Sequence, residues 1–347
     1  MKHRILIALT SVLLVACSQE PVVVPLDSTV ERQGIMYELN SQKPFRGAVE
    51  VNYPNGQLQQ RSNYKAGKLD GLVETYFESG QLKLRVNFKA LKPDGLKEIY
   101  FENGQLRERS NWKAGERDGL FERYFESGQL EQRSNYKAGE LDGLHETYFE
   151  NGQISIRANY KAGEWDGLWY SWHGNGQLAE RSNYKAGKLD GLLKIYLYNG
   201  QISRRTNYKA GERDGLRETY FESGQLEERL NYKAGKLNGL WEMYYKNGQL
   251  KSKSNYKAGD YDGLVEHYYE NGQLKQRTES QIAQKIDGLF ESYYENGQLK
   301  ERGNYIAGKE DGLHEMYFET GEWNAKSIYK DGKRIDHQWQ FQARDRY

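Results

Sequence analysis

The chain has 347 residues, and its 50 Lys and Arg almost balance its 49 Asp and Glu. This balance lacks the basic surplus that nucleic-acid binding requires on some face of a protein. A single Cys excludes both a disulfide framework and a Cys-based zinc site. The charged fraction of 29% is high, but 13% aromatic residues do not fit a disordered chain, and 37% hydrophobic residues are few for a thick core. We therefore expect a thin or extended fold.

Residues 1–16 have the pattern of a bacterial lipoprotein signal peptide. Lys2 and Arg4 precede an apolar run at residues 5–15, which is too short to span a bilayer, since a spanning helix needs ~20 residues. The following residues, up to Cys17, resemble a lipobox. The resemblance implies cleavage before Cys17, lipid on that residue, and attachment to the membrane of the cell envelope. Because Ser18 follows, the outer membrane is expected if the host is Gram-negative. The alternative is an ordinary signal peptide with an incidental Cys.

The mature chain is predicted to begin with a tether. Residues 17–33 comprise the lipidated Cys and a short extended segment that contains Pro21 and Pro25 and has no periodic pattern. Residues 35–39 offer an extra strand in front of the first repeat. Residues 336–347 abandon the repeat pattern and are predicted to form a C-terminal cap.

Between these ends, residues 34–335 contain twelve tandem repeats of 24 residues. One Gly of each repeat lies in an Asp-Gly-Leu sequence, which reads Arg-Gly-Ala in the first repeat and Asn-Gly-Leu at Gly239, and a second Gly comes nine residues later, usually as Asn-Gly or Ser-Gly. Asn-Gly between alternating residues predicts a β-hairpin with a two-residue type I′ turn. The first Gly of each repeat is at position 47, 71, 95, 119, 143, 167, 191, 215, 239, 263, 288 or 312.

The hairpin model fixes a register that can be checked. It places Phe125 opposite Leu130 and Glu122 opposite Arg133. The position of Glu122 holds Glu in ten of twelve repeats, and its partner is Arg or Lys in all twelve. Both faces of the sheet are mixed in polarity, so no dedicated core face is expected. The predicted fold is all-β: an elongated single-layer antiparallel sheet of tandem hairpins, twisted or curved.

The repeated sequence, as in Asp-Gly-Leu-x-Glu-x-Tyr-Phe-Glu-x-Gly-Gln-Leu-x-x-Arg-x-Asn-Tyr-Lys-Ala-Gly-Lys, resembles the MORN repeat variant in the form found in bacterial proteins of the YwqK-like antitoxin group. Residues 37–58 also resemble the start of many bacterial lipoproteins of that group. The resemblance covers residues 34–335. It implies a repeat protein that acts as a scaffold or binds a partner, and for some relatives an antitoxin.

We find no constellation for catalysis, a metal or a cofactor in the sequence. The five His that remain after signal cleavage lie repeats apart and are interpreted as surface substitutions. The recurring Glu could form a row that binds Ca²⁺, but ion pairs with the facing Arg explain them better. Asp70 and its equivalents are interpreted as turn residues that bond the local backbone. The His are His145, His173, His267, His314 and His337.

Departures from the repeat are the candidates for binding. Three of the seven Trp fall within eight residues, and such clusters are enriched where proteins bind partners. The alternative is a locally repacked repeat. Leu91, which replaces a repeat Gly, and the longer stretch at residues 278–286 are expected to kink the sheet. The candidate partner-binding residues are Trp165, Trp169, Tyr170, Trp172 and His173.

These features predict a non-enzymatic lipoprotein of the cell envelope. Its repeats would present a binding or scaffolding surface to another protein or to an envelope polymer, with the membrane reached through lipid on Cys17 and no role for nucleic acid. The first alternative is an antitoxin or immunity protein that neutralises a partner toxin. An enzyme that uses acidic and Tyr residues of the sheet is a third possibility.

Overall fold

The computed structural model describes residues 22–282 and 285–339, which belong to two compact units that we treat separately. Unit 1 ends at Gly128, and unit 2 begins at Gln129. The predicted signal peptide (residues 1–16), Cys17 and residues 340–347 of the predicted cap lie outside the described residues. Within the described ranges we find no helix with the length and hydropathy of a membrane span.

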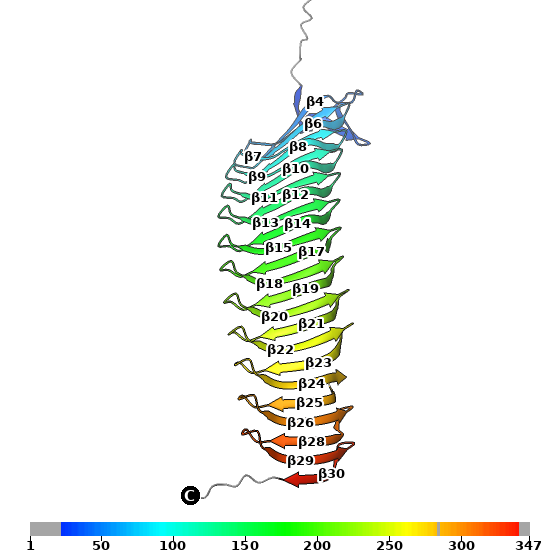
Figure 1. Ribbon diagram of the computed structural model, residues 1–347. Coiled ribbons are helices and arrows are strands. Elements are labelled where there is room, and N and C mark those ends of the chain that lie inside the picture. The colour runs from blue at the N-terminus through cyan, green and yellow to red at the C-terminus, as the bar shows by residue number, and fades with distance from the viewer. Residues whose placement is uncertain (1–21, 283–284, 340–347) are drawn as a thin grey trace, which may run out of the picture. The chain divides into compact units, whose positions relative to one another are not determined.

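The prediction of an all-β fold built from tandem hairpins is confirmed. From β4 to β10 and from β11 to β30, strands that are neighbours in the chain pair antiparallel, except that the short β16 and β27 pair only with β15 and β26. Figure 1 shows the turns alternating between two edges. Unit 1 contains the 3-10 turn η1 (Leu26–Ser28) and strands β1 (Val23–Pro25), β2 (Thr29–Arg32), β3 (Ile35–Glu38), β4 (Gly47–Asn52), β5 (Leu58–Lys65), β6 (Lys68–Tyr76), β7 (Leu82–Lys89), β8 (Lys92–Tyr100), β9 (Leu106–Lys113) and β10 (Glu116–Tyr124).

Unit 2 continues the same pattern of paired strands. Its strands are β11 (Leu130–Lys137), β12 (Glu140–Tyr148), β13 (Ile154–Lys161), β14 (Glu164–Trp172), β15 (Leu178–Lys185), β16 (Lys188–Leu189), β17 (Gly191–Tyr196), β18 (Ile202–Lys209), β19 (Glu212–Tyr220), β20 (Leu226–Lys233), β21 (Lys236–Tyr244), β22 (Leu250–Lys257), β23 (Asp260–Tyr268), β24 (Leu274–Ile282), β25 (Lys285–Tyr293), β26 (Leu299–Ile306), β27 (Lys309–Glu310), β28 (Gly312–Tyr317), β29 (Trp323–Lys330) and β30 (Lys333–Trp339).

The Asn-Gly turn differs from the predicted type I′ turn. Between β12 and β13, the N–H of Gly152 donates to the carbonyl of Phe149 at 2.9 Å, and Gly152 has φ +80° whereas Asn151 keeps a negative φ. This is a type I turn followed by a left-handed Gly, which inserts a bulge. Consequently Tyr148, not Phe149, pairs with Ile154 on the return strand. The predicted pairing of Phe with the first Leu of that strand is wrong for this reason.

The type I′ turn lies at the other end of each hairpin, in the Lys-Ala-Gly sequence. Ala162 and Gly163 both have positive φ, 48° and 78°, and Lys161 pairs with Glu164 across the turn. Ala rarely adopts this conformation, because its Cβ approaches the carbonyl oxygen that follows. Leu91 adopts it too, with φ 68°, so its repeat keeps the two-residue turn.

The Asp-Gly-Leu sequence is a bulge inside a strand and not a turn. Gly143 has φ +108° within β12, and the register shifts opposite it. The carboxylate of Asp142 accepts a hydrogen bond from the N–H of Ala162, twenty residues later, at 3.4 Å. The expected bond to the local backbone is therefore wrong, because this Asp supports the strained turn of the next hairpin. The same bond joins Asp70 to Ala90, Asp94 to Ala114, Asp166 to Ala186, Asp214 to Ala234 and Asp287 to Ala307.

The two faces of the hairpins bury different kinds of side chain. Residues paired directly across antiparallel strands share a face, so Glu218 and Arg229 lie on one face while Arg217 and Leu230 lie on the other. We call the first the ladder face and the second the packed face. The packed face contains a buried column: Leu193 is 6% exposed and Ser182 is fully buried. The expectation that the sheet has no core face is therefore wrong.

The N-terminal elements cover the first repeat. β1 pairs parallel with β4, and Met36, Phe45 and Val49 form a buried cluster against which Val24 and Tyr64 pack. β3 forms a strand as expected at residues 35–39, but it pairs with β2 in a separate two-stranded sheet. Within the predicted tether, residues 23–32 form β1, η1 and β2.

At the C-terminal end, β30 pairs antiparallel with β29. The repeat pattern of the sheet thus extends to residue 339, into the segment predicted as a cap.

Candidate functional site on the ladder face

The ladder face is held by a row of shared ion pairs. Glu218 accepts hydrogen bonds from Arg229 of its own hairpin (Nε to Oε1, 3.0 Å), from Arg205 of the preceding hairpin, and from the hydroxyl of Tyr220 at 2.8 Å. Its side chain is 1% exposed, whereas both Arg are 41% exposed. Burial alone raises the pKa of Glu218, but the bonds from Arg205, Tyr220 and Arg229 together hold this pKa below its ordinary value.

The predicted pairing of Glu with Arg is confirmed by equivalent pairs in both units. Glu74 meets Arg85 at 3.0 Å, and Glu146 meets Arg157 at 2.8 Å. Each such Glu is surrounded by cationic and hydroxyl donors, which accounts for its charge without a bound cation. In the described residues we find no group of three His, Cys, Asp or Glu side chains able to hold a metal ion.

A row of half-exposed Leu lies beside these ion pairs on the same face. In β19, Leu216 and Glu218 alternate with residues of the packed face and therefore point to the ladder face. The Leu at this position are exposed by 37% to 51% in five repeats. They are Leu96, Leu168, Leu192, Leu264 and Leu313.

The ladder is interrupted at two consecutive repeats of unit 2. Tyr170, in the first of them, was predicted as part of an aromatic binding cluster, whereas Lys194, in the second, was not predicted. Tyr170 and Lys194 occupy the two positions that lack Glu. Arg181 pairs across the strands with both of them, and Lys194 also lies opposite Arg205. The guanidinium of Arg181 lies 5.9 Å from the ring centroid of Tyr170. Adjacent exceptions in an otherwise constant column were the available signal in the sequence.

The five residues predicted to form a binding cluster separate into three places. Trp165 and Trp169 lie on the packed face with ring centroids 6.5 Å apart. Tyr170 and Trp172 stack on the ladder face at 5.8 Å. His173 lies in the loop before β15, and its ring stacks on Tyr198 at 4.0 Å. Trp169 and Tyr170 separate because consecutive residues of a strand point to opposite faces.

The His residues are not all surface substitutions. His314 is 9% exposed, and its ring nitrogens lie 2.9 Å from Glu301 and 3.3 Å from Glu310. The Glu301 carboxylate raises the pKa of His314 above its ordinary value against the opposing effect of burial. His145 is bonded to Ser134 at 2.8 Å, and burial lowers its pKa. The interpretation as surface positions is therefore wrong for His314, which belongs to the packed column.

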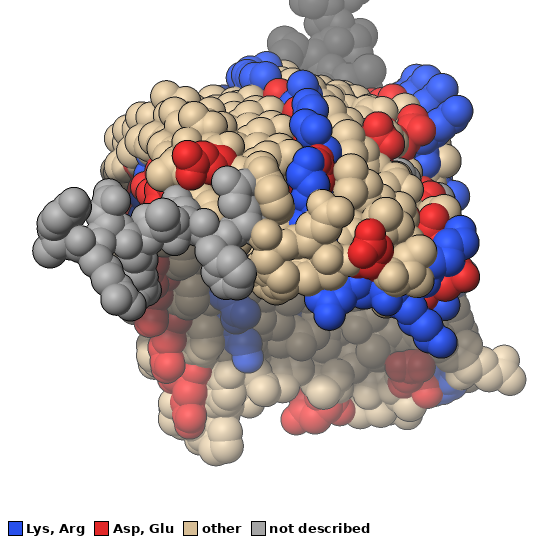
Figure 2. All heavy atoms as spheres, turned by 60° about the horizontal axis from the view of Figure 1, so that its bottom comes forward, with Lys and Arg blue, Asp and Glu red and all other residues tan. Residues whose placement is uncertain are grey.

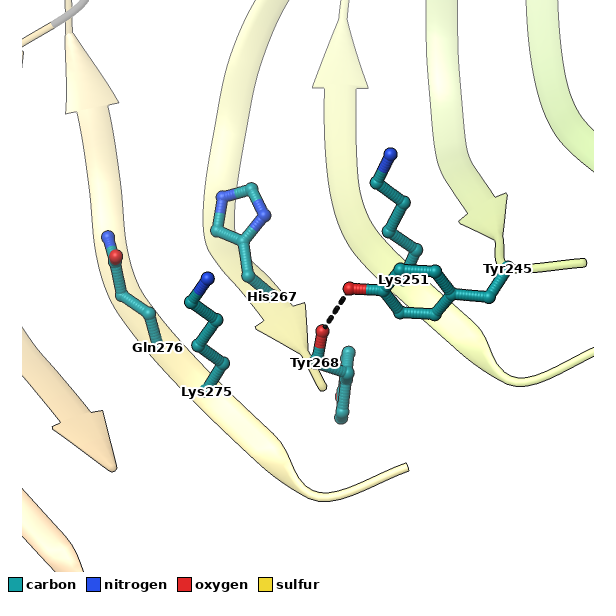
Figure 3. A pocket seen from close by; sticks show the side chains of 6 residues that line it. All are labelled: Tyr245, Lys251, His267, Tyr268, Lys275 and Gln276. Atoms are coloured by element: carbon teal, nitrogen blue, oxygen red, sulfur yellow. Dashed lines mark hydrogen bonds between the residues drawn. The ribbon is translucent and has the colours of Figure 1, made fainter. Parts of the chain in front are cut away.

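A shallow hollow of about 300 Å³ lies near the loops of β22, β23 and β24 (Figure 3). Its floor includes the hydroxyl of Tyr245, which donates to the carbonyl of Tyr268 at 2.9 Å. Lys251 and Lys275 stand on either side of His267, whose pKa is lowered by burial and by Lys275. The six lining residues comprise two Tyr, two Lys, one His and one Gln, so the hollow is basic in character. They are Tyr245, Lys251, His267, Tyr268, Lys275 and Gln276.

Basic side chains also form a narrow row on one face in the space-filling view (Figure 2). Acidic atoms appear in this view as separate patches, on the same face and at its margins. On the ladder face, the Arg of a pair reaches solvent while its Glu is buried, as in Arg157–Glu146 and Arg229–Glu218.

Two solved structures that are similar to this chain resemble it weakly. A chain from the crystal structure of TcdB2-TccC3 matches at 11% identity with a TM-score of 0.18, over 82% of this chain and 18% of that chain. Choline binding protein F from Streptococcus pneumoniae matches at 16% identity with a TM-score of 0.19, over 85% of this chain and 97% of that chain. At these TM-scores the similarities support no conclusion on fold or function. No curated protein matches the chain.

The family comparison is decisive. The model of the MORN repeat variant matches eleven consecutive segments, and a twelfth hairpin of the same form, β28–β29, follows them. The matched residues are 46–66, 69–90, 93–114, 117–138, 141–162, 165–186, 189–210, 213–234, 237–258, 261–280 and 286–307. These segments make up most of the chain and coincide with the hairpins described above. The chain therefore belongs to the MORN repeat variant family.

Proposed function

We propose that this chain is a non-enzymatic lipoprotein of the cell envelope whose ladder face binds another protein. The observation that carries the proposal is the row of half-exposed Leu beside exposed Arg, repeated from hairpin to hairpin. Apolar side chains next to Arg are characteristic of protein interfaces, in which Arg is enriched and Lys and Glu are depleted. The buried Glu keep the Arg in place and remain inaccessible to a partner.

Crosslinking in intact envelopes tests this function. A photoreactive amino acid is placed at Leu192 or Leu264 on the ladder face, and at Tyr198, which is 71% exposed in a loop, as a matched control. We expect discrete crosslinked species from the two Leu positions and none from Tyr198. Crosslinks from Tyr198 alone, or none from any position, would contradict binding through the ladder face.

The envelope location and the absence of an activity are tested separately. Replacing Cys17 by Ala should move the protein from the membrane fraction to the soluble fraction, since its lipid anchor would be lost. Continued membrane association would argue against lipidation. A screen against hydrolase substrates should show no turnover, and a turnover that one substitution abolishes would refute the non-enzymatic function.

A further inference from the structure

We propose that the interruption of the ladder at Tyr170, Arg181 and Lys194 binds an acidic segment of a partner protein. The incoming carboxylates would take the place that Glu occupies in the other repeats. This inference rests on the proposed protein-binding function and adds the position of the site and the chemistry of the partner.

The first support is a local excess of positive charge. Along the ladder face from Glu146 to Glu218, the paired positions hold Arg157, Tyr170, Arg181, Lys194 and Arg205 in succession. Four cations therefore share two carboxylates, whereas cations and carboxylates alternate one to one along the intact part of the ladder. Neighbouring strands are ~4.8 Å apart, so Arg181, Lys194 and Arg205 form a cluster of like charges.

The two carboxylates at the ends of this stretch are already engaged. Glu146 accepts from Arg157 at 2.8 Å and from the hydroxyl of Tyr148 at 2.8 Å. Glu218 accepts from Arg205, Arg229 and Tyr220, as described above. Within the part of the chain that the structure describes, no carboxylate lies within 4.0 Å of Arg181 or Lys194. Two cations are thus available to an external anion.

The apolar surroundings favour a peptide over a small inorganic anion. Tyr170 and Trp172 stack beside Arg181, and Leu168 and Leu192 are 38% and 39% exposed on the same face. A peptide segment can cover these rings and Leu side chains while its Glu or Asp side chains pair with the cations. A carboxylate also reproduces the pairing that the same Arg position makes in the intact repeats.

Binding of a labelled oligoglutamate peptide to the full chain, purified in detergent, tests the site. Fluorescence anisotropy at low ionic strength should show binding that weakens as salt is added. Lys194→Glu supplies the missing carboxylate from this chain and should weaken binding by about tenfold, and Arg181→Gln should weaken it by a similar factor. The matched control is Lys251→Glu, which makes the same charge change in the hollow of Figure 3 and should leave the affinity within about twofold.

Three results would overturn the inference. They are no binding by the wild-type chain, equal weakening by Lys251→Glu and Lys194→Glu, and binding to phosphatidylglycerol vesicles but not to the peptide. Thermal melting of each variant verifies that it is folded, and Lys194→Glu is expected to melt no lower than the wild type. If envelope crosslinks from Leu264 persist in Lys194→Glu, the proposed function stands while the site lies elsewhere; if the wild type gives no crosslinks, the proposed function itself fails.

Discussion

The ladder face and the packed face of the same hairpins follow opposite rules. On the ladder face the same residue types recur, so that Glu74, Glu146 and Glu218 make the same contacts in their own repeats. On the packed face the central column changes in size from repeat to repeat, as Leu193 and Trp169 show. The constant face fixes the register of the strands. The variable face provides burial, and its side chains need only fill the space that their neighbours leave.

The two repeats that lack the ladder Glu show how the roles of the two faces differ. Tyr170 and Lys194 cannot form the shared ion pair, yet β14 and β17 keep the same pairing as the other strands. On the opposite face of that region, Trp165 contacts Trp169 at 6.5 Å and Tyr184 at 4.8 Å. Trp165 is 37% exposed and Trp169 is half-buried, so these rings remove part of a large apolar surface from water, which offsets the loss of the ion pair. The fold therefore tolerates an interrupted ladder where the packed face is well filled.

The largest effect is expected on the packed face. Leu193→Ala should lower the free energy of unfolding by about 3 kcal/mol, because Leu193 is 6% exposed and its removal leaves a cavity. Its neighbour Leu192, 39% exposed on the ladder face, is the matched control, and Leu192→Ala should cost less than about 1 kcal/mol. Urea unfolding measures both. Equal losses would show that the packed face is not the source of burial.

A smaller loss of stability is expected from a substitution on the ladder face. Glu218→Gln removes the charge that three donors share and should destabilise the protein by about 2 kcal/mol, measured in the same way. The two Arg limit the loss, because each is 41% exposed and can be hydrated. Glu227→Gln, at an exposed position of the facing strand β20, should change stability by no more than about 0.5 kcal/mol. If Glu218→Gln were equally silent, the ladder would contribute nothing.

Two His of the packed column should respond to pH in opposite directions. The pKa of His314 is raised by Glu301, so its contribution to stability is present below its unfolded pKa of about 6.5 and is lost as the pH rises through the higher folded value. The pKa of His145 is lowered by burial, so its protonation at low pH destabilises the fold. Unfolding of His314→Gln and His145→Gln from about pH 5.5 to about pH 8.5 measures both contributions. Parallel pH profiles for the two variants would contradict this assignment.

The smallest effect tests the interruption itself. Lys194→Glu restores a carboxylate between Arg181 and Arg205 and should stabilise the protein by about 0.5 kcal/mol, seen as a higher melting temperature at low salt. Lys251→Glu makes the same charge change away from the ladder and should give no such gain. A gain that survives high salt would indicate a cause other than charge pairing.

Periodicity predicted more of this fold than propensity did. The spacing of Gly and the matching of Glu with Arg defined the hairpins and most of their register, because a sheet requires these residues to face each other. The type I′ turn was predicted at Asn-Gly but lies at Lys-Ala-Gly. The prediction failed because Asn-Gly suits both a type I′ turn and a type I turn followed by a left-handed Gly. The type I′ turn at Ala162 was not predicted, because Ala rarely adopts a left-handed conformation.

Burial and the candidate site were harder to predict for a different reason. The packed column depends on contacts between strands that sequence polarity does not reveal, so His314 was assigned to the surface. The Trp cluster looked continuous along the chain, although alternation of side chains in a strand already separates Trp169 from Tyr170. The gap at Lys194 required the ladder to be seen as one row, in which an absent Glu leaves neighbouring cations unpaired.

The bond from Asp142 to Ala162 also gives the array a direction. Six strained Ala turns are supported by an Asp that was made twenty residues earlier, and the turn at Ala258 is supported in the same way by Asn238. The first turn, at Ala66, has no earlier repeat to supply this Asp, and there Gly67 donates to the carbonyl of Phe45. A newly synthesised hairpin therefore closes against one that already exists, in the order in which the ribosome releases the chain. Removing repeats from the C-terminal end leaves the Asp of each remaining turn of this kind in place, whereas a cut at the N-terminal end removes the Asp that supports the first remaining turn.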